Sequence, residues 1–296
     1  MGIMSKMQTF RTAQNTAETI SVKDKRYSLN ALIKNMIPPF LFQIYANAKN
    51  YLIPLKSWQE AEEKNPLGYF DQDIANLVAF KTEATLNKNT CLYSLLDLQS
   101  ISAIGIARQF CASSTFRVAD IGGACGLHYF NAKRLFQETV FSWQVYETKP
   151  MIQAAEKFKS AELHFDTLPA QFNDFDLIHC SGTLGFIKES DEMLEKILNS
   201  DVPFILLARI CTVVNSPQDV FVLHKHLLKY DGPGAELPDF FSDKTVAYPA
   251  RLFSRQKFEE KLCRNYQIIF KVRDASAELK VKNHHTVGMT YFLRRR

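Results

Sequence analysis

Apolar positions recur at helical spacing along the chain after residue 28. They are dense from Leu32 to Ile37, stop at Pro38–Pro39 and resume from Phe40 to Tyr51. Proline inside such a pattern ends or kinks a helix, so the pattern predicts a broken, apolar helical hairpin. Residues 1–28 are polar and show no sustained periodicity, which predicts a flexible leader.

The apolar hairpin permits two interpretations. Residues 31–55 either pack as a lid on the rest of the chain, or form an amphipathic contact with a membrane surface or a partner protein. No uncharged apolar run approaches the roughly 20 residues that span a bilayer, and the start of the chain lacks a signal-peptide pattern. We therefore expect a cytoplasmic protein, peripheral at the inner membrane face if the second interpretation holds.

A second helical block follows the hairpin. The apolar pattern predicts helices over residues 58–64, from an N-cap at Asp71 to about Leu86, and over residues 92–110. Nothing in this block resembles a cluster of nucleophiles or metal ligands. The helical N-terminal region as a whole is predicted to extend over residues 29–114.

Beyond Phe116 short apolar strands alternate with helices. Strands are predicted over residues 116–121, 141–146, 162–165, 175–180, 202–210, 266–273 and 286–293, with helices over residues 127–138, 150–159 and 191–199. This alternation predicts an α/β fold over residues 115–296, with a mostly parallel, Rossmann-like sheet covered by helices on both faces. The last two strands lack an intervening helix and are predicted to pair as an antiparallel hairpin.

Composition and charge exclude several classes of protein. Of 296 residues, 46% are hydrophobic, which suffices for a sizeable core and excludes a disordered chain. The net charge of +5 comes from basic residues spread along the chain, so no nucleic-acid partner is predicted. The six cysteines lie far apart without a Cys-x-x-Cys pair. Neither a zinc knuckle nor a dithiol redox motif is expected, and no metal site is predicted.

A glycine-rich turn with the sequence DIGGACG, residues 120–126, joins the first predicted strand of this sheet to the helix after it. Such a turn lies at the carboxyl edge of a doubly wound sheet, where ligands bind. The dinucleotide motif Gly-x-Gly-x-x-Gly ending at Gly126 would need glycine in place of Ile121. Counted from Asp120, the turn resembles the acidic-x-Gly-x-Gly-x-Gly signature of class I S-adenosylmethionine-dependent methyltransferases, with Ala124 replacing the middle glycine.

This resemblance implies that the turn contacts the cofactor through Asp120, Gly122, Gly123 and Gly126. Glu147, which ends the second strand, is placed to accept hydrogen bonds from both ribose hydroxyls of a nucleoside. Nicotinamide cofactors and S-adenosylmethionine share this ribose. Glu147 therefore predicts nucleoside binding without distinguishing the two.

Three further positions complete the predicted cofactor site. Asp166 follows the third strand and either accepts a hydrogen bond from the adenine amine or caps its own loop. Ser181 ends the fourth strand, which resembles the methyltransferase strand beside the methyl donor. Tyr129 either steadies the cationic sulfur with its ring or packs in the helix core. The fourth strand lacks the Asn/Asp-Pro-Pro-aromatic motif of base- and amide-methylating enzymes, so an oxygen or other small-molecule acceptor is expected.

At a finer level the chain resembles a methyltransferase family often encoded among bacterial surface-polysaccharide genes. The resemblance covers nearly everything after Leu29 and rests on Ile37-Pro38-Pro39, Ser57-Trp58-Gln59-Glu60-Ala61, Gly68-Tyr69, Asp120-Ile121-Gly122-Gly123, Gly126, His128-Tyr129-Phe130, Ser181-Gly182-Thr183-Leu184, Arg209 and Tyr248-Pro249-Ala250-Arg251-Leu252-Phe253. The chain departs from the family at Ala124 and Cys125, and at His224 or His226, where a glutamine-bearing segment is expected. The resemblance implies S-adenosyl-L-methionine as cofactor and a sugar or glycan hydroxyl as methyl acceptor.

Methylation of a sugar hydroxyl requires a general base, for which histidine is the simplest candidate. The candidates are His128 beside the turn, His179 at the end of the fourth strand, and His224 and His226 after the fifth. Arg209 is a candidate ligand for an acidic sugar or a nucleotide phosphate, or a member of an ordinary ion pair. Two other functions stay open: a nicotinamide-dependent oxidoreductase, and a non-catalytic binding or scaffold protein of the same fold.

Overall fold

A computed structural model describes the chain over residues 51–64, 68–88, 93–234, 237–238, 241–242, 244–274, 280–281 and 284–296. The predicted leader and the predicted apolar hairpin up to residue 50 lie outside these residues. Over the described ranges, no helix combines the length and the apolar composition that crossing a bilayer needs.

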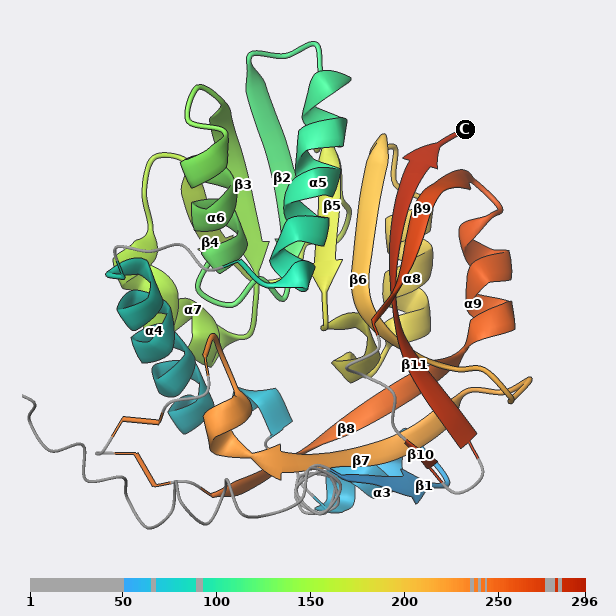
Figure 1. Ribbon diagram of the computed structural model, residues 1–296. Coiled ribbons are helices and arrows are strands. Elements are labelled where there is room, and N and C mark those ends of the chain that lie inside the picture. The colour runs from blue at the N-terminus through green and yellow to red at the C-terminus, as the bar shows by residue number, and fades with distance from the viewer. Residues whose placement is uncertain are drawn as a thin grey trace, which may run out of the picture. The chain divides into compact units, whose positions relative to one another are not determined.

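Five parallel strands form the centre of the main sheet (Figure 1). In the order β4-β3-β2-β5-β6, they are β4 (Leu163–Asp166), β3 (Val140–Tyr146), β2 (Thr115–Ile121), β5 (Leu177–Ser181) and β6 (Phe204–Val213). The chain moves outward from β2 to β4 and then returns to place β5 on the other side of β2. The carboxyl ends of β2 and β5 therefore form the switch point at which doubly wound sheets bind ligands.

Helices cover both faces of this sheet, as the sequence predicts. On one face α5 (Leu95–Gln109) and α6 (Leu127–Leu135) pack against β2 and β3. On the other face lie α8 (Ser190–Leu198) and α9 (Arg255–Leu262). α7 (Lys149–Ala155) packs beside α4 (Gln72–Leu86), outside these two layers.

Antiparallel strands complete the far end of the sheet. β11 (His284–Arg295) pairs with β6 on one side and with β9 (Tyr266–Asp274) on the other. The pairing of β9 with β11 confirms the predicted hairpin. Together with the five parallel strands it confirms the α/β, Rossmann-like fold class.

A β-bulge interrupts β6 just beyond its pairing with β5. Two residues of β6, Ala208 and Arg209, stand opposite the single residue Thr290 of β11, because the register shifts there. Arg209 has a left-handed backbone with φ 53°. A bulge bends its strand and redirects the side chain that follows, and this one lies at the carboxyl edge of the sheet.

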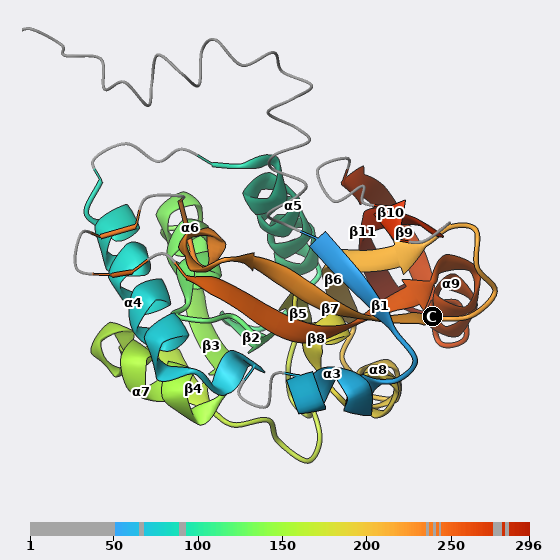
Figure 2. The same ribbon diagram turned by 90° about the horizontal axis from the view of Figure 1, so that it is seen from below.

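A smaller antiparallel sheet lies beneath the carboxyl ends of the parallel strands in the view of Figure 1, and across the front in Figure 2. This floor sheet has the order β1-β7-β8, from β1 (Tyr51–Leu55), β7 (Val220–Leu227) and β8 (Thr245–Ser254). Its strand β8 pairs briefly with the end of β6, and α3 (Trp58–Lys64) packs on it.

Two sequence predictions need correction at the floor sheet. Residues 51–55 form a strand, although the apolar pattern places them within a helical region. The long segment after residue 210, for which no element is predicted before Tyr266, holds β7, β8 and α9. In both cases the strand is stabilised by pairing with a segment distant in sequence.

The remaining described elements are short. They are η1 (Gly68–Phe70), η2 (Glu156–Phe158), η3 (Leu184–Phe186), η4 (Leu228–Tyr230) and β10 (Lys280–Val281). The predicted N-cap of α4 is confirmed, because Asp71 Oδ1 accepts a hydrogen bond from the backbone nitrogen of Asp73 at 2.9 Å. α5 begins three residues later than predicted, after a capping box formed by Ser94 and Asp97.

Candidate functional site

The glycine-rich turn joins β2 to α6 at the switch point of the sheet. Its backbone is left-handed at Gly122 (φ 69°) and Gly126 (φ 78°), a conformation that glycine adopts without strain. A Cβ atom at Gly122 would overlap the side chain of Thr183, and one at Gly123 would overlap the carboxylate of Asp120. The side chains of Thr183 and Asp120 thus fill the space beside these two glycines, so no larger residue fits at either position.

Asp120 supports the turn from inside the protein. Its buried carboxylate accepts a hydrogen bond from Trp143 Nε1 at 3.1 Å and lies 2.7 Å from His179 Nδ1. Burial alone would raise the pKa of Asp120, but the charge and hydrogen bond of His179 hold this pKa below its usual value. The predicted contact of Asp120 with the cofactor is therefore replaced by an indirect role, which is to position the turn.

His179 continues this buried network. Its Nε2 lies 3.1 Å from Ser100 Oγ. The order Asp120–His179–Ser100 resembles the catalytic triad of hydrolases, but His179 is 0% exposed and Ser100 only 2%. The ring of His128 lies 4.5 Å from that of His179, and burial, with the charge of His179, lowers the pKa of His128 to about 4. Burial and two engaged nitrogens favour a structural role for His179 over the predicted role as general base.

Glu147 lies at the end of β3 and faces the turn. Its Oε1 accepts a hydrogen bond from the backbone nitrogen of Ala124, in the middle of the turn, at 3.1 Å, and its Oε2 accepts one from the backbone nitrogen of Thr148 at 2.9 Å. Burial raises the pKa of Glu147 to about 7, against these two hydrogen bonds, which lower it. Each carboxylate oxygen has two lone pairs, so both oxygens have capacity for one hydroxyl donor each.

Asp166 and Ser181 lie at the same edge. The backbone carbonyl of Asp166 accepts a hydrogen bond from the backbone nitrogen of Glu147 at 2.9 Å, and its exposed carboxylate accepts one from the backbone nitrogen of Thr167 at 2.7 Å. Asp166 thus caps its own loop, one of the two roles left open by the sequence. Ser181 ends β5 and accepts hydrogen bonds from Arg209, to Oγ at 3.2 Å and to the carbonyl at 2.9 Å.

Tyr129 lies away from the turn. It is 7% exposed, packs edge-on against Phe141 and Trp143, and donates its hydroxyl to Glu162 at 3.1 Å. This position favours core packing over the predicted contact with the cationic sulfur.

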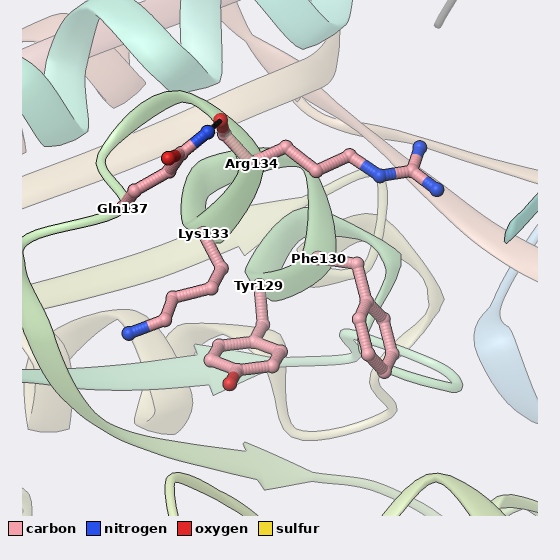
Figure 3. A pocket seen from close by; sticks show the side chains of 5 residues that line it. All are labelled: Tyr129, Phe130, Lys133, Arg134 and Gln137. Carbon is pink, nitrogen blue, oxygen red and sulfur yellow. Dashed lines mark hydrogen bonds between the residues drawn. The ribbon is translucent and has the colours of Figure 1, made fainter. Parts of the chain in front are cut away.

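A surface hollow of about 340 Å³ adjoins Tyr129 on α6. It is lined by Tyr129, Phe130, Lys133, Arg134 and Gln137 (Figure 3). No other predicted site residue lines it, and its lysine is paired with Glu162. The hollow is therefore separate from the candidate site.

An aromatic cluster connects the floor sheet to the carboxyl edge. Tyr69 of η1 stacks on Tyr248 of β8, with ring centroids 4.0 Å apart and planes at 7°. Phe186 of η3 meets Tyr69 edge-on at 5.4 Å and lies nearly parallel to His224 of β7 at 6.1 Å. Because η3 follows β5 directly, these rings lie between the end of the central sheet and the floor sheet.

Tyr69 also marks where the charged groups of the site converge. Burial raises the pKa of its hydroxyl well above the usual value; the charges of Asp231 and Glu147 raise it further, and that of Arg209 lowers it. The Tyr69 hydroxyl therefore lies within electrostatic range of Glu147, Arg209 and Asp231. These groups border a common site.

His226 on β7 forms a pair with Asp231. Its Nε2 lies 3.2 Å from both carboxylate oxygens, and the Tyr248 hydroxyl donates to Asp231 Oδ2 at 2.9 Å. His226 Nδ1 is buried, and no described residue makes a hydrogen bond to it. A carboxylate at Nε2 fixes the proton there, so Nδ1 is the nitrogen left to accept a proton.

Lys81 of α4 holds the loop that carries Asp231. Its buried ammonium donates hydrogen bonds to the backbone carbonyls of Lys229 (2.6 Å), Asp231 (2.8 Å) and Gly234 (2.8 Å). The neighbouring His224 is partly exposed, and burial of its ring, with the charge of His226, lowers its pKa to about 4. At neutral pH His224 is therefore an uncharged imidazole at the floor of the site.

The sequence identified the candidate histidines and Arg209 but missed the residues that organise them. Tyr69 and Tyr248 occur in motifs that carry the family resemblance, which is the one signal that could have found them. No sequence motif points to Lys81 or Asp231, because Lys81 lies 150 positions before Asp231, whose backbone carbonyl it contacts.

The geometry fits a nucleoside cofactor. The glycine-rich turn lies at the carboxyl edge of the sheet, and Glu147 offers two acceptor oxygens beside it. Among the described residues, no three His, Cys, Asp or Glu side chains are grouped closely enough to hold a metal ion.

No known protein family matches the chain, and no curated protein is similar to it. Solved structures do resemble its fold. They include a S-adenosylmethionine-dependent methyltransferase from Clostridium acetobutylicum, which is 13% identical, with a TM-score of 0.44, over 73% of this chain and 97% of that one. They also include the amino pentose methyltransferase CalS10 from Micromonospora echinaspora (13% identity, TM-score 0.41, 71% of this chain and 100% of that one). A third is the sugar N-methyltransferase KedS8 from a Streptoalloteichus species (12% identity, TM-score 0.37, 71% and 96%). At these identities and TM-scores the similarity supports no statement about the activity of this chain.

Proposed function

We propose that the protein is an S-adenosyl-L-methionine-dependent methyltransferase that acts on a hydroxyl group of a sugar or glycan. The observation that carries this proposal is the hydrogen bond, 3.1 Å long, between Glu147 and the middle of the glycine-rich turn at Ala124. It puts an acceptor for two ribose hydroxyls against the glycine-rich turn, at the switch point of the sheet. When bound, the cofactor supplies an activated methyl group.

The chain's own residues orient the reactants and accept a proton. Glu147 holds the ribose, and the floor sheet closes the edge from the opposite side. The rings of Tyr69 and Phe186 offer apolar faces to a sugar ring. One of the two histidines of β7 accepts the proton of the sugar hydroxyl. His224 is the partly exposed one, whereas Nδ1 of His226 has no described partner but is buried.

A nicotinamide-dependent oxidoreductase would use the same ribose contact. The dinucleotide motif, however, needs glycine where Ile121 ends β2, and the Ile121 side chain is 1% exposed in the core. A non-catalytic scaffold would instead have a site that binds no nucleoside. The contact of Glu147 with a turn that resembles the methyltransferase signature favours the methyltransferase over both.

Isothermal titration calorimetry separates these functions. We expect S-adenosylmethionine and S-adenosylhomocysteine to bind and NAD not to bind. Glu147→Ala should weaken cofactor binding by about 1–3 kcal/mol, the usual effect of leaving polar groups unpaired, whereas the exposed control Glu138→Ala should not. Binding of NAD alone would point to the oxidoreductase, binding of no nucleoside to the scaffold, and unchanged affinity in Glu147→Ala would remove the ribose role.

The acceptor is tested in cells. Mass spectrometry of glycans from strains with and without the gene should show one methyl group that depends on the gene. We also propose a cytoplasmic location with a peripheral contact at the inner membrane face or a partner. Since residues 51–55 belong to the floor sheet, that contact is proposed for residues 31–50, and cell fractionation of a chain with charged substitutions there tests it.

A further inference from the structure

We propose that Arg209 binds an anionic group of the methyl acceptor, a carboxylate or a phosphate, so that the acceptor is an acidic or phosphorylated sugar. This inference rests on the proposed function, since it concerns the acceptor side of the same site. The backbone of Arg209, its side-chain partners and its place at the sheet edge each support it.

The backbone of Arg209 is held in an unfavourable conformation. Its φ is 53°, and among the described non-glycine residues only Ala124 and Asp174 also have a positive φ. A left-handed conformation costs an L-residue about 1–2 kcal/mol. Strain of this kind persists where the surrounding structure enforces it, and it gathers at ligand-binding positions. Here the bulge opposite Thr290 enforces it.

The side chain of Arg209 is fixed but has no anionic partner. Nε and one terminal nitrogen donate to Ser181, while the residue as a whole is exposed. Arg117, Arg251 and Arg255 each pair with a carboxylate, whereas Arg209 pairs with none among the described side chains. A guanidinium has five N–H donors in a rigid fork. Its remaining donors are thus presented in one orientation before any ligand binds, which lowers the entropic cost of binding an anion.

The guanidinium also lies close against the main chain of the site. A Cβ at Gly182, the residue after Ser181, would come within 2.8 Å of the Arg209 guanidinium. Glycine at position 182, with φ 71°, is therefore what lets the arginine lie across the end of β5. The charges of Arg209 and Glu147 both shift the pKa of the Tyr69 hydroxyl, so Arg209 and Glu147 border one site.

An anion at Arg209 could come from the acceptor or from the amino-acid carboxylate of the cofactor. The strand order favours the acceptor. Glu147 ends β3 on one side of β2, whereas Arg209 lies on β6, beyond β5 on the other side. β6 is also the strand that pairs with β8 of the floor sheet. Arg209 therefore lies on the side of the sheet edge opposite Glu147, and it lies closer to the floor sheet than the glycine-rich turn does.

The test is calorimetry on the full chain with Arg209→Gln, Arg209→Lys and the control Arg264→Gln, an arginine that is 63% exposed on the surface. The first arm compares S-adenosylhomocysteine with 5′-methylthioadenosine, which lacks the amino-acid carboxylate. The second arm titrates glucuronate, glucose 1-phosphate and neutral glucose into protein saturated with S-adenosylhomocysteine.

We expect Arg209→Gln to bind S-adenosylhomocysteine like the wild type, which also shows that the variant folds. It should bind the anionic sugars about 10- to 100-fold more weakly, as loss of a charge-assisted hydrogen bond implies. Arg209→Lys should fall between, because it keeps the charge without the fork, and the control should bind all ligands normally.

Three results would overturn the inference. One is loss of S-adenosylhomocysteine affinity in Arg209→Gln with methylthioadenosine unaffected, which would assign the arginine to the cofactor. The others are anionic sugars that bind no better than glucose, and anionic sugars that bind Arg209→Gln as well as the wild type. Failure of the proposed function is distinguishable, because then neither nucleoside binds in the first arm.

Discussion

Glu147 links the candidate site to the stability of the fold. Burial raises its pKa to about 7, whereas the ordinary value is 4.5. Between these values the unfolded chain has lost the proton and the folded chain still holds it, so rising pH favours unfolding. We expect this group to lower the free energy of unfolding of the cofactor-free protein by about 1–3 kcal/mol as the pH rises from 4.5 through 7, and the effect to level off at higher pH.

Urea denaturation of the wild type and Glu147→Gln over this pH range isolates the effect, because all other titrating groups are common to both proteins. The difference between their unfolding free energies should change across the range and level off near pH 7. Glu138→Gln, at an exposed position, should follow the wild type. Parallel curves for the wild type and Glu147→Gln would mean that the carboxyl titrates at its ordinary pKa.

The backbone strain at Arg209 can be measured apart from its charge. Asparagine adopts the left-handed conformation more readily than other L-residues, whereas a β-branched residue is an outlier there. We expect the free energy of unfolding of Arg209→Asn to exceed that of Arg209→Val by about 1–2 kcal/mol. Both variants lack the guanidinium, so their difference in chemical denaturation reports the backbone alone. Equal stability of the two would show that position 209 can relax.

At the scale of elements, α4 stabilises the loop after β7 through one buried lysine. Lys81→Met would leave three backbone carbonyls without their donor, so we expect the free energy of unfolding to fall by about 1–3 kcal/mol. Hydrogen exchange of residues 229–234 should accelerate more than that of β2 and β3. The matched control is Lys88→Met, at an exposed position just beyond the same helix. Uniform acceleration over the chain would mean that Lys81 supports the whole fold equally.

Elements with local signals can be predicted from the sequence. The start of α4 follows from its N-cap Asp71, and the pairing of β9 with β11 follows from the missing helix between them. The floor sheet cannot be predicted in this way. β7 is partly exposed at five of its eight positions, so its apolar residues do not alternate, and β1 is a strand only because it pairs with β7, which comes much later in the chain.

The same distinction applies to the candidate site. The glycine-rich turn and Glu147 are predictable because each directly follows a strand, so sequence order alone puts them at the carboxyl edge. Tyr129 and His179 have suitable chemistry, but burial decides their roles, and burial depends on the packing of whole elements. Asp231 and Lys81 meet only through the tertiary fold.

At the scale of the whole described molecule, the two sheets share a continuous core. Cys125 of the turn and Met151 of α7 belong to the same buried cluster as Ile74 of α4 and, from the floor sheet and the loop beyond it, Tyr248 and Leu228. The two sides of the candidate site are thus parts of one packed unit. A ligand that binds only the folded state should therefore stabilise both sheets together.

The two tryptophans of the chain test this coupling, since each reports on one sheet. Trp143 lies buried in the central sheet, and Trp58 lies on α3 against the floor sheet. In Trp58→Phe and in Trp143→Phe, urea unfolding followed by the remaining tryptophan should coincide with unfolding followed by circular dichroism. S-adenosylhomocysteine at 100 times its Kd should raise both transitions by about 2.7 kcal/mol. An earlier transition at Trp58 that the ligand leaves unchanged would mean that the floor sheet unfolds independently, and the acceptor side of the site would then be a separately folding element.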